Sequence, residues 1–205
     1  MYLYMGKLGL LAKTGIDLSG EAGTIIHKKE NVGAVELATM SFGQSFQITP
    51  VQMLRAVAAI VNGGKLVTPH FGLYTSSSDG SVVNEFAYST EEEAISSQTS
   101  EMMKQILEGV VSEGGGTKAY IEGYSIGGKT ATSQKLPRGS GKYISSFIGF
   151  APADNPQVIA MCLIDEPTGV YYGGTIAAPV VKTLYENILP YLGIERSVQL
   201  EKNSD

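Results

Sequence analysis

Apolar residues recur at helical spacing in three parts of the chain. The first part begins at Thr49, which can serve as an N-cap, with Pro50 in the first turn and Gln52 closing a capping box. Its apolar stripe ends at the Gly63-Gly64 pair, where we expect the helix to stop. The second part runs from about Gln98 to Ser112. We interpret its stripe as core rather than as a binding groove; it comprises Met102, Met103, Ile106, Leu107, Val110 and Val111.

The third helical pattern lies near the end of the chain, from about Gly174 to Tyr191. Pro179 falls either in the first turn of this helix or at a kink. Four apolar residues share one face of the predicted helix, namely Ile176, Val180, Leu184 and Ile188.

Three extended segments precede this last helix, at 127–134, 143–150 and 157–165. Turn residues separate them, first at Pro137 to Gly141 and then in the sequence APADNP. The pattern therefore predicts three consecutive strands. Between the first two helices the chain predicts a strand pair, a polar turn and an irregular segment, at 65–74, 75–80 and 82–93.

The first of these strands carries the candidate chemistry. Gly127 and Gly128 leave room for another backbone or a ligand to come close. Lys129 follows, and then small hydroxyl residues. Alternation along a strand places Thr130, Thr132 and Gln134 on one face, and Lys129, Ala131 and Ser133 on the other. A lysine beside small hydroxyl residues on an edge strand suits a carboxylate-bearing, peptide-like ligand. The alternative is an exposed edge strand with a solubilising lysine.

The composition of the chain excludes several other classes of function. The 205 residues are 43% hydrophobic and 17% charged, as expected for one globular domain. The net charge of -5 and the lack of a basic cluster argue against nucleic acid as a partner. A single cysteine and two isolated histidines, His27 and His70, give no metal site, and we expect no cofactor. The longest apolar run, Val158 to Ile164, is far shorter than the roughly 20 residues of a membrane span. The N-terminus does not read as a signal peptide.

Four stretches together resemble one family, in the order in which the family has them. They are KTGIDLSGEAG, SFGQSFQITPVQ, the Lys129-Thr130 strand, and the segment from SSFIGF to YLGI. They resemble the transpeptidase domain of class B penicillin-binding proteins of the division or sporulation type, from about Leu10 to Ile194. The resemblance implies a mixed α/β (α+β) fold like that of serine β-lactamases, with an antiparallel sheet and flanking helices. It also implies that 1–194 is the C-terminal portion of that domain, without its N-terminal strands and nucleophile helix, and that 195–205 is a polar tail.

The resemblance further implies acyl transfer by a serine nucleophile, organised by Ser-x-x-Lys, Ser-x-Asn and Lys-Thr-Gly motifs. Only the third motif has a counterpart in this chain. By this resemblance Lys129 supplies positive potential, Thr130 holds the ligand carboxylate, and Thr132 contacts that carboxylate and offers its backbone N–H to the oxyanion hole. The substrate-binding set is completed by Ala131, Ser133 and Gln134.

Two residues depart from the family pattern, because Ala131 and Ser45 both stand where glycine is usual. We expect Ala131 to alter β-lactam affinity. The chain also spells the motif literally at Lys13-Thr14-Gly15, but this copy lies in a turn-rich segment, and we interpret it as structural. Asp17 and Glu21 nearby are expected to be turn and cap residues.

The expected partners are the D-Ala-D-Ala end of a peptidoglycan stem peptide and β-lactams, together with the missing N-terminal half of the domain or a second copy of the chain. The parent protein is expected to be anchored on the extracytoplasmic face of the bacterial membrane. Alone, the chain is expected to be inactive. Two alternatives stay open: a non-catalytic binding or scaffold remnant of the same fold, and a fragment of a β-lactamase or β-lactam sensor.

Overall fold

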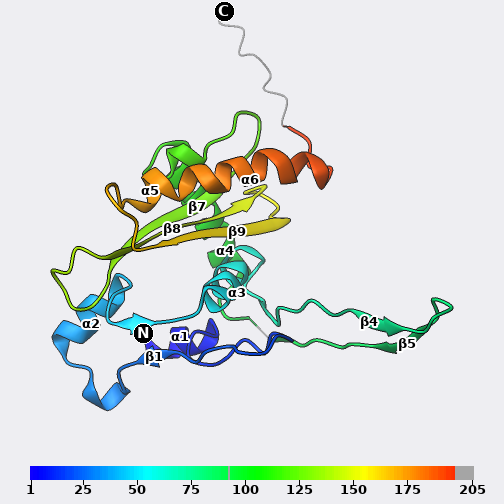
Figure 1. Ribbon diagram of the computed structural model, residues 1–205, viewed down its shortest axis with the longest axis horizontal. Coiled ribbons are helices and arrows are strands. Elements are labelled where there is room, and N and C mark those ends of the chain that lie inside the picture. The colour runs from blue at the N-terminus through cyan, green and yellow to red at the C-terminus, as the bar shows by residue number, and fades with distance from the viewer. Residues whose placement is uncertain (92, 197–205) are drawn as a thin grey trace, which may run out of the picture. The chain divides into compact units, whose positions relative to one another are not determined.

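The computed structural model describes residues 1–91 and 93–196 (Figure 1). The chain divides into two compact units, Met1–Ser100 and Glu101–Asp205.

The first unit combines short helices with three small antiparallel strand pairs, β1–β2, β3–β6 and β4–β5. The predicted helix after Thr49 is confirmed, including its capping box. The elements of this unit are α1 (Tyr2–Lys7), β1 (Ile25–Ile26), η1 (Lys29–Asn31), α2 (Ala34–Ser41), β2 (Phe46–Gln47), α3 (Pro50–Val61), β3 (Leu66–Val67), β4 (Tyr74–Ser76), β5 (Val82–Glu85) and β6 (Thr90–Glu91).

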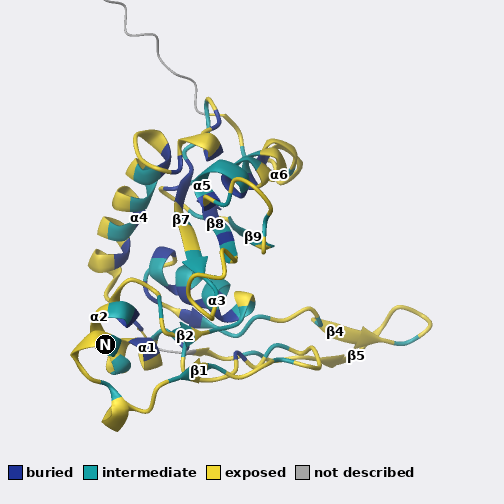
Figure 2. Ribbon diagram, turned by 60° about the vertical axis from the view of Figure 1, so that its left-hand side comes forward, coloured by how far each residue is buried: buried dark blue, intermediate teal, exposed yellow. Residues whose placement is uncertain are grey.

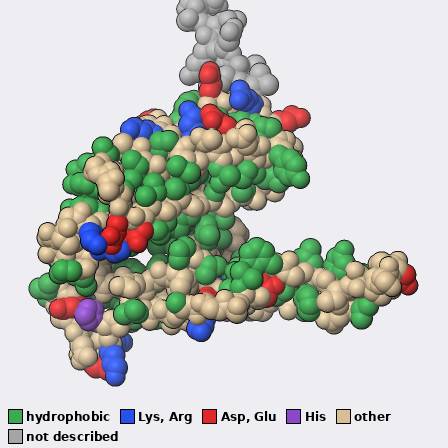
Figure 3. All heavy atoms as spheres, viewed as in Figure 1, with side chains coloured by type: hydrophobic (Ala, Val, Ile, Leu, Met, Phe, Trp, Pro, Cys, Tyr) green, Lys and Arg blue, Asp and Glu red, His purple; other side chains and the backbone are tan. Residues whose placement is uncertain are grey.

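The predicted strand pair within 65–74 is wrong, and so is the irregular segment at 82–93. β3 pairs with β6, whereas β4 pairs with β5 across the polar turn. The partners of β3 and β4 therefore both lie further along the chain than the sequence pattern indicated. Strands this short have too few residues to show a clear alternation of apolar and polar positions. Hydrophobic side chains protrude along the β4–β5 hairpin (Figure 3), including Leu73, Tyr74, Val82 and Val83.

The Gln52 side chain is fully buried and does more than cap α3. Its Oε1 accepts from the backbone N–H of Thr49 at 2.8 Å. Its amide nitrogen donates to the carbonyl of Ala12 at 2.6 Å and to Oγ1 of Thr24 at 2.8 Å. One side chain therefore joins the start of α3 to two points of the segment that precedes it, and its polar atoms are satisfied.

The literal Lys13-Thr14-Gly15 triplet is structural, as expected. Thr14 is buried, and both its backbone N–H and its hydroxyl donate to Oε1 of Glu21 at 2.7 Å. The carboxylate of Asp17 accepts from the backbone N–H groups of Phe71 and Gly72. These amides, that of Gly72 foremost, lower the pKa of Asp17. Glu21 therefore holds the turn in which it lies, as expected, whereas Asp17 binds a segment more than 50 residues away along the chain and is not a local turn residue.

The second unit is a three-stranded antiparallel sheet in the order β7-β8-β9, with helices packed against it. The three predicted strands are confirmed. α4 (Ser97–Ser112) leads from the first unit into the second. The remaining elements are η2 (Thr117–Ala119), β7 (Gly127–Gln134), β8 (Tyr143–Ala151), β9 (Val158–Asp165), α5 (Gly173–Ile176) and α6 (Ala178–Tyr191).

The core of this unit lies between the sheet and α6, and β8 is the most buried of the three strands (Figure 2). Phe147 and Tyr185 are completely buried, and the Tyr185 hydroxyl donates to the carbonyl of Gly149 at 2.5 Å. Because burial desolvates the phenolate, it raises the pKa of Tyr185 well above the usual value.

The face predicted for the last helix is wrong by one residue. Val180 and Leu184 are 50% and 42% exposed, and the buried stripe is Val181, Tyr185 and Leu189. Ile176 belongs to the separate short helix α5, and Pro179 lies in the first turn of α6. A separate helix therefore begins at Ala178. A single helical pattern that starts at Gly174 assigns the wrong residues to its buried face.

The interpretation of the α4 stripe as core is wrong for Met102 and Ile106, which are each 58% exposed. Lys104 is buried instead. Its ammonium donates to the carbonyl of Asp154 at 2.7 Å and pairs with Glu101 at 2.8 Å. A lysine can occupy the buried face of a helix when its aliphatic chain packs against apolar groups and its ammonium group contacts a carbonyl or a carboxylate.

Candidate active-site strand

The glycine pair at the start of β7 makes room for aromatic rings of the core, not for a ligand. A Cβ atom at Gly127 would overlap the ring of Phe150, and one at Gly128 would overlap the ring of Phe147. Both rings belong to β8, the neighbouring strand. The sequence predicted close approach of a backbone or a ligand, and the first is found at Gly128, where a Cβ atom would also lie 2.8 Å from the carbonyl oxygen of Ile148. The two glycines let β7 lie close over two core side chains, which fixes the position of the residues that follow.

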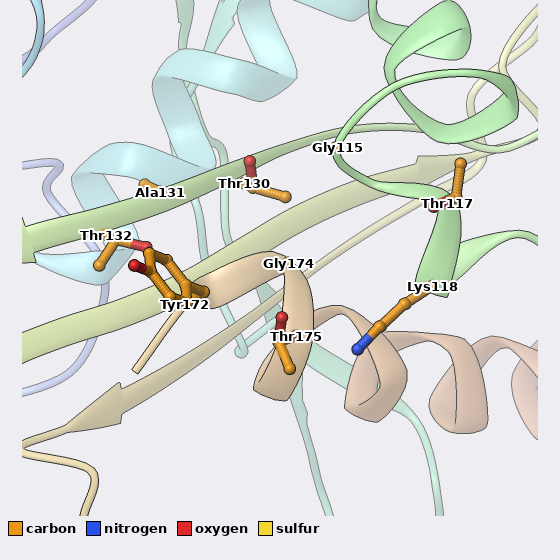
Figure 4. Close-up of a pocket in the computed structure, with 9 residues that line it drawn as sticks. All are labelled: Gly115, Thr117, Lys118, Thr130, Ala131, Thr132, Tyr172, Gly174 and Thr175. Carbon is orange, nitrogen blue, oxygen red and sulfur yellow. The ribbon is translucent and has the colours of Figure 1, made fainter. Parts of the chain in front are cut away.

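Beyond the glycines, β7 borders a pocket of about 310 Å³ (Figure 4). Three segments contribute to it: the turn around η2, the middle of β7, and the start of α5. The pocket is lined by Gly115, Thr117, Lys118, Thr130, Ala131, Thr132, Tyr172, Gly174 and Thr175. Hydroxyl groups therefore dominate its polar lining, and none of these nine residues is acidic.

Thr132 is oriented by a backbone group of the facing segment. The N–H of Gly173 donates to Oγ1 of Thr132 at 3.0 Å. A hydroxyl that accepts through its oxygen still has its hydrogen to donate. Thr132 can therefore donate a hydrogen bond to an acceptor in the pocket, and a carboxylate is the strongest such acceptor.

The glycine pair at the start of α5 allows this contact. A Cβ atom at Gly173 would overlap the carbonyl oxygens of Ala131 and Ser146, and one at Gly174 would lie 2.5 Å from the carbonyl oxygen of Gly115. The backbone of α5 thus lies directly on the sheet. The sequence pattern predicted a helix from about Gly174 but assigned this segment no part in the site. The sequence feature that could have revealed this close contact is the pair of glycines that follows two tyrosines.

A row of tyrosines leads from β8 to the pocket. The rings of Tyr143 and Tyr171 stack with centroids 4.0 Å apart, and Tyr171 and Tyr172 follow at 4.7 Å. Ser145 donates from its hydroxyl to the carbonyl of Tyr171, which holds the segment to the sheet. A hydrogen bond with Tyr171 raises the pKa of Tyr172 above its usual value. Tyr172 therefore offers a neutral aromatic wall, which the sequence analysis did not single out.

The structure brings together some of the predicted site residues but not all. Thr130, Ala131 and Thr132 line the pocket. Lys129 is exposed and lies outside this lining, and its ammonium donates to the carbonyl of Thr130 at 2.7 Å. Ser133 and Gln134 continue β7 beyond the pocket and are half-buried. The threonines and the lysine of the motif therefore face different surroundings.

A cluster of four charged residues lies where the three strands end. Lys135 pairs with Asp165 at 2.9 Å and with Glu166 at 2.7 Å, and Lys142 pairs with Glu166 at 2.8 Å. Hydrogen bonds from Lys135 and Lys142 lower the pKa of Glu166 to about 2. Glu166 also adopts a left-handed backbone conformation, with φ of 50°. The cluster fixes the end of β9, from which the tyrosine segment departs.

This cluster gives the folded chain a pH-dependent component of stability. The folded pKa of Glu166 lies below its ordinary value of 4.5, so the contribution is present above about pH 4.5 and is lost as the pH falls toward 2. We expect Glu166→Gln to lower the melting temperature by no more than a few degrees at pH 7, because exposed ion pairs contribute little. The difference from wild type should shrink between pH 5 and 3. A difference that stays constant over this range would contradict the assignment.

The described part of the chain shows no group of three or more potential metal ligands. Among the described helices, none combines the length and apolar character needed to cross a membrane.

Comparison with known proteins identifies the family. A model described as the penicillin binding protein transpeptidase domain matches residues 1–186. Stage V sporulation protein D of Bacillus subtilis is 42% identical over 208 residues, which cover 98% of this chain and 32% of that protein. Peptidoglycan D,D-transpeptidase FtsI of Escherichia coli is 33% identical over 198 residues, which cover 92% of this chain and 31% of that protein.

A solved structure shows the same fold. Penicillin binding protein 3 of Mycobacterium tuberculosis, complexed with ampicillin, superposes with a TM-score of 0.86 at 29% sequence identity. The match covers 98% of this chain and 47% of that one, so the chain spans less than half of the solved protein and about a third of the two curated relatives. The fold class and the family resemblance expected from the sequence motifs are both confirmed. The chain belongs to the penicillin-binding protein transpeptidase domain family.

Proposed function

We propose that this chain is the C-terminal half of a peptidoglycan D,D-transpeptidase domain and contributes its substrate-binding and β-lactam-binding strand. One observation carries the proposal: two threonine hydroxyls of the Lys-Thr strand, Thr130 and Thr132, line an open pocket whose lining contains no acidic residue. Such a pocket is suited to the terminal carboxylate of a D-Ala-D-Ala peptide, or to that of a β-lactam. Relatives that are named peptidoglycan D,D-transpeptidases support the reaction class.

In the proposed reaction a serine attacks the carbonyl of the D-Ala–D-Ala peptide bond, the terminal D-alanine leaves with the serine proton on its amine, and an acyl-enzyme ester remains. The amine of a neighbouring stem peptide then attacks this ester, forms the new peptide bond and releases the serine. Thr130 and Thr132 hold the carboxylate, and the backbone N–H of Thr132 is one donor of the oxyanion hole. Lys129 raises the positive potential at the strand. Ser133 and Gln134 extend the edge along which the peptide backbone of the ligand pairs. No metal or cofactor enters this scheme.

The serine nucleophile is proposed to lie in another part of the domain, because the chain contains no Ser-x-x-Lys motif placed for it. The character of β9 supports a larger sheet. Seven of its eight residues are apolar, and β8 is its only partner among the described strands. Nearly continuous apolar runs are typical of strands covered on both faces. We therefore expect β9 to pair with further strands of the domain or, in their absence, with a second copy of the chain.

The ligand class follows from the same pocket. Penicillin binding protein 3 of Mycobacterium tuberculosis was solved with ampicillin and with aztreonam, and we propose β-lactams as ligands of the complete domain here. Ala131 places a methyl group at the pocket where the family pattern has glycine, so we expect altered affinity rather than loss of binding. The complete protein is proposed to act at the outer face of the cytoplasmic membrane, where peptidoglycan is cross-linked.

Labelling with a fluorescent penicillin, followed by denaturing electrophoresis, tests the proposal. The 205-residue chain alone should show no covalent band. The chain mixed with a separately produced N-terminal half should show one, as should the complete protein. A band on the chain alone would reveal a nucleophile within it and would contradict the division of roles. Absence of labelling in the complete protein would reject the transpeptidase assignment.

A second candidate is a non-catalytic binding or scaffold protein of the same fold. Ala131, where the family pattern has glycine, favours it. The coding sequence upstream of this chain separates the two candidates. An in-frame Ser-x-x-Lys at the family position supports the enzyme, and its absence supports the scaffold.

A further inference from the structure

The pocket beside β7 contains one charged side chain, and it is not the lysine of the motif. Lys118 lines the pocket, whereas the ammonium of Lys129 is engaged by the carbonyl of Thr130. Figure 4 shows the Lys118 side chain extending from η2 toward Thr175, with Thr130 and Thr132 on the neighbouring strand β7. The ammonium of Lys118 therefore lies on the same side of the sheet as the hydroxyls proposed to hold a carboxylate.

The backbone that carries Lys118 is firmly placed. Its neighbour Ala119 is fully buried in the core cluster of the second unit. Backbone hydrogen bonds close the turn, from the N–H of Ala119 to the carbonyl of Gly116 at 2.8 Å and from that of Tyr120 to the carbonyl of Thr117 at 3.1 Å. A Cβ atom at Gly116 would come within 3.0 Å of the carbonyl oxygen of Val110, so the turn also packs closely on α4. Only the Lys118 side chain itself is free to adjust.

The charge of Lys118 has no counterpart in the described part of the chain. Its ammonium takes part in none of the ion pairs found there, in contrast to Lys104, Lys135 and Lys142. Its side chain is exposed, so a lysine without a partner costs little here. A cation held at the edge of a hydroxyl-lined pocket without acidic residues raises the local concentration of anions and favours their binding.

We propose that Lys118 is a carboxylate-recognition residue of this pocket and acts on the same terminal carboxylate that Thr130 and Thr132 bind. This inference rests on the proposed function and adds to it a residue outside the Lys-Thr strand. Thr130 and Thr132 supply directed hydrogen bonds, whereas Lys118 supplies charge from the facing turn. Lys118 thus selects ligands with a free carboxylate over neutral ones.

The test compares benzylpenicillin with its methyl ester, which differ in the negative charge at the carboxylate. In the complete protein, Lys118→Met should lower the second-order rate constant of acylation by benzylpenicillin about fivefold at low ionic strength, the upper range for an exposed charge pair. The rate with the ester should stay the same. Lys118→Arg should restore most of the rate. The loss should shrink in high salt, because salt screens exposed charges.

Lys182→Met is the matched control, since Lys182 lies on α6 and pairs only weakly with Glu186 at 3.9 Å. It should leave both rate constants unchanged. An equal loss with both ligands would show that Lys118 supports the structure only, and no loss with either would show that it does not face the carboxylate. Both results overturn the inference but leave the proposed function standing. A wild-type protein that benzylpenicillin does not acylate would overturn both.

Discussion

Replacing Gly173 by alanine is expected to lower the free energy of unfolding by at least about 3 kcal/mol, at the upper end of the cost of overpacking. The new methyl group would meet the carbonyl oxygens of Ala131 and Ser146, which are backbone atoms of two paired strands. Neither can move aside without distorting the sheet. The alternative is that α5 lifts away, and then the hydrogen bond to Thr132 is lost. Urea-induced unfolding, followed by circular dichroism at a concentration where the chain is monomeric, measures the change.

Gly109→Ala is the matched control for this substitution. Gly109 lies in α4, and a Cβ atom there would meet nothing within 4 Å. Alanine is favoured over glycine in a helix by about 1 kcal/mol, so this variant should be slightly more stable than wild type. Comparable stabilities of the Gly173→Ala and Gly109→Ala variants would show that α5 does not press on the sheet as described.

Replacing Thr132 by valine is expected to slow acylation of the complete protein by benzylpenicillin by between about tenfold and a hundredfold, which corresponds to the loss of one hydrogen bond to a charged group. Valine keeps the shape of threonine but has no hydroxyl. The pocket would lose a donor to the carboxylate, and the N–H of Gly173 would lose its acceptor. The rate constant, measured by stopped-flow or by quenched labelling with fluorescent penicillin, reports the effect.

Two further variants show whether the hydroxyl is responsible. Thr132→Ser retains it and should stay within about tenfold of wild type. Thr183→Val removes a hydroxyl from α6 that only bonds back to the carbonyl of Pro179, so it should leave acylation unchanged. If Thr132→Val acylates as fast as wild type, Thr132 does not hold the ligand and the proposed site is wrong.

The sequence allowed the regular elements of this chain to be predicted wherever local chemistry determines them. The cap formed by Thr49 and Gln52 placed the start of α3, and turn residues separated the strands β7, β8 and β9. The buried face of α6 could not be read in the same way. Tyr185 is buried there because its hydroxyl finds the carbonyl of Gly149. Lys104 likewise depends on Asp154, which lies 50 residues away.

The candidate site could likewise be predicted where local sequence determines it, but not where it depends on distant contacts. The Lys-Thr motif indicated the strand, and Thr130 and Thr132 were placed correctly on one face of it. Which residues stand opposite that face depends on packing between segments distant in sequence. Gly173 approaches Thr132 across 41 positions, and the tyrosine row reaches the pocket only because Tyr143 and Tyr171 stack. Lys118 gave no pattern of its own, since it is a single cation in a turn.

Because the backbone of α5 lies in contact with the sheet, the residues of the pocket fall into two groups. The groups differ in how freely their residues can be substituted during evolution. Gly173 and Gly174 cannot gain a side chain without a clash with backbone atoms, so selection on ligand affinity has little room at these positions. Ala131, Lys118 and Tyr172 are exposed and can vary at small cost to the fold. If the complete protein binds β-lactams as proposed, substitutions that change this binding are expected to accumulate in the second group. Ala131, for which the resemblance to the family implies glycine, lies within it.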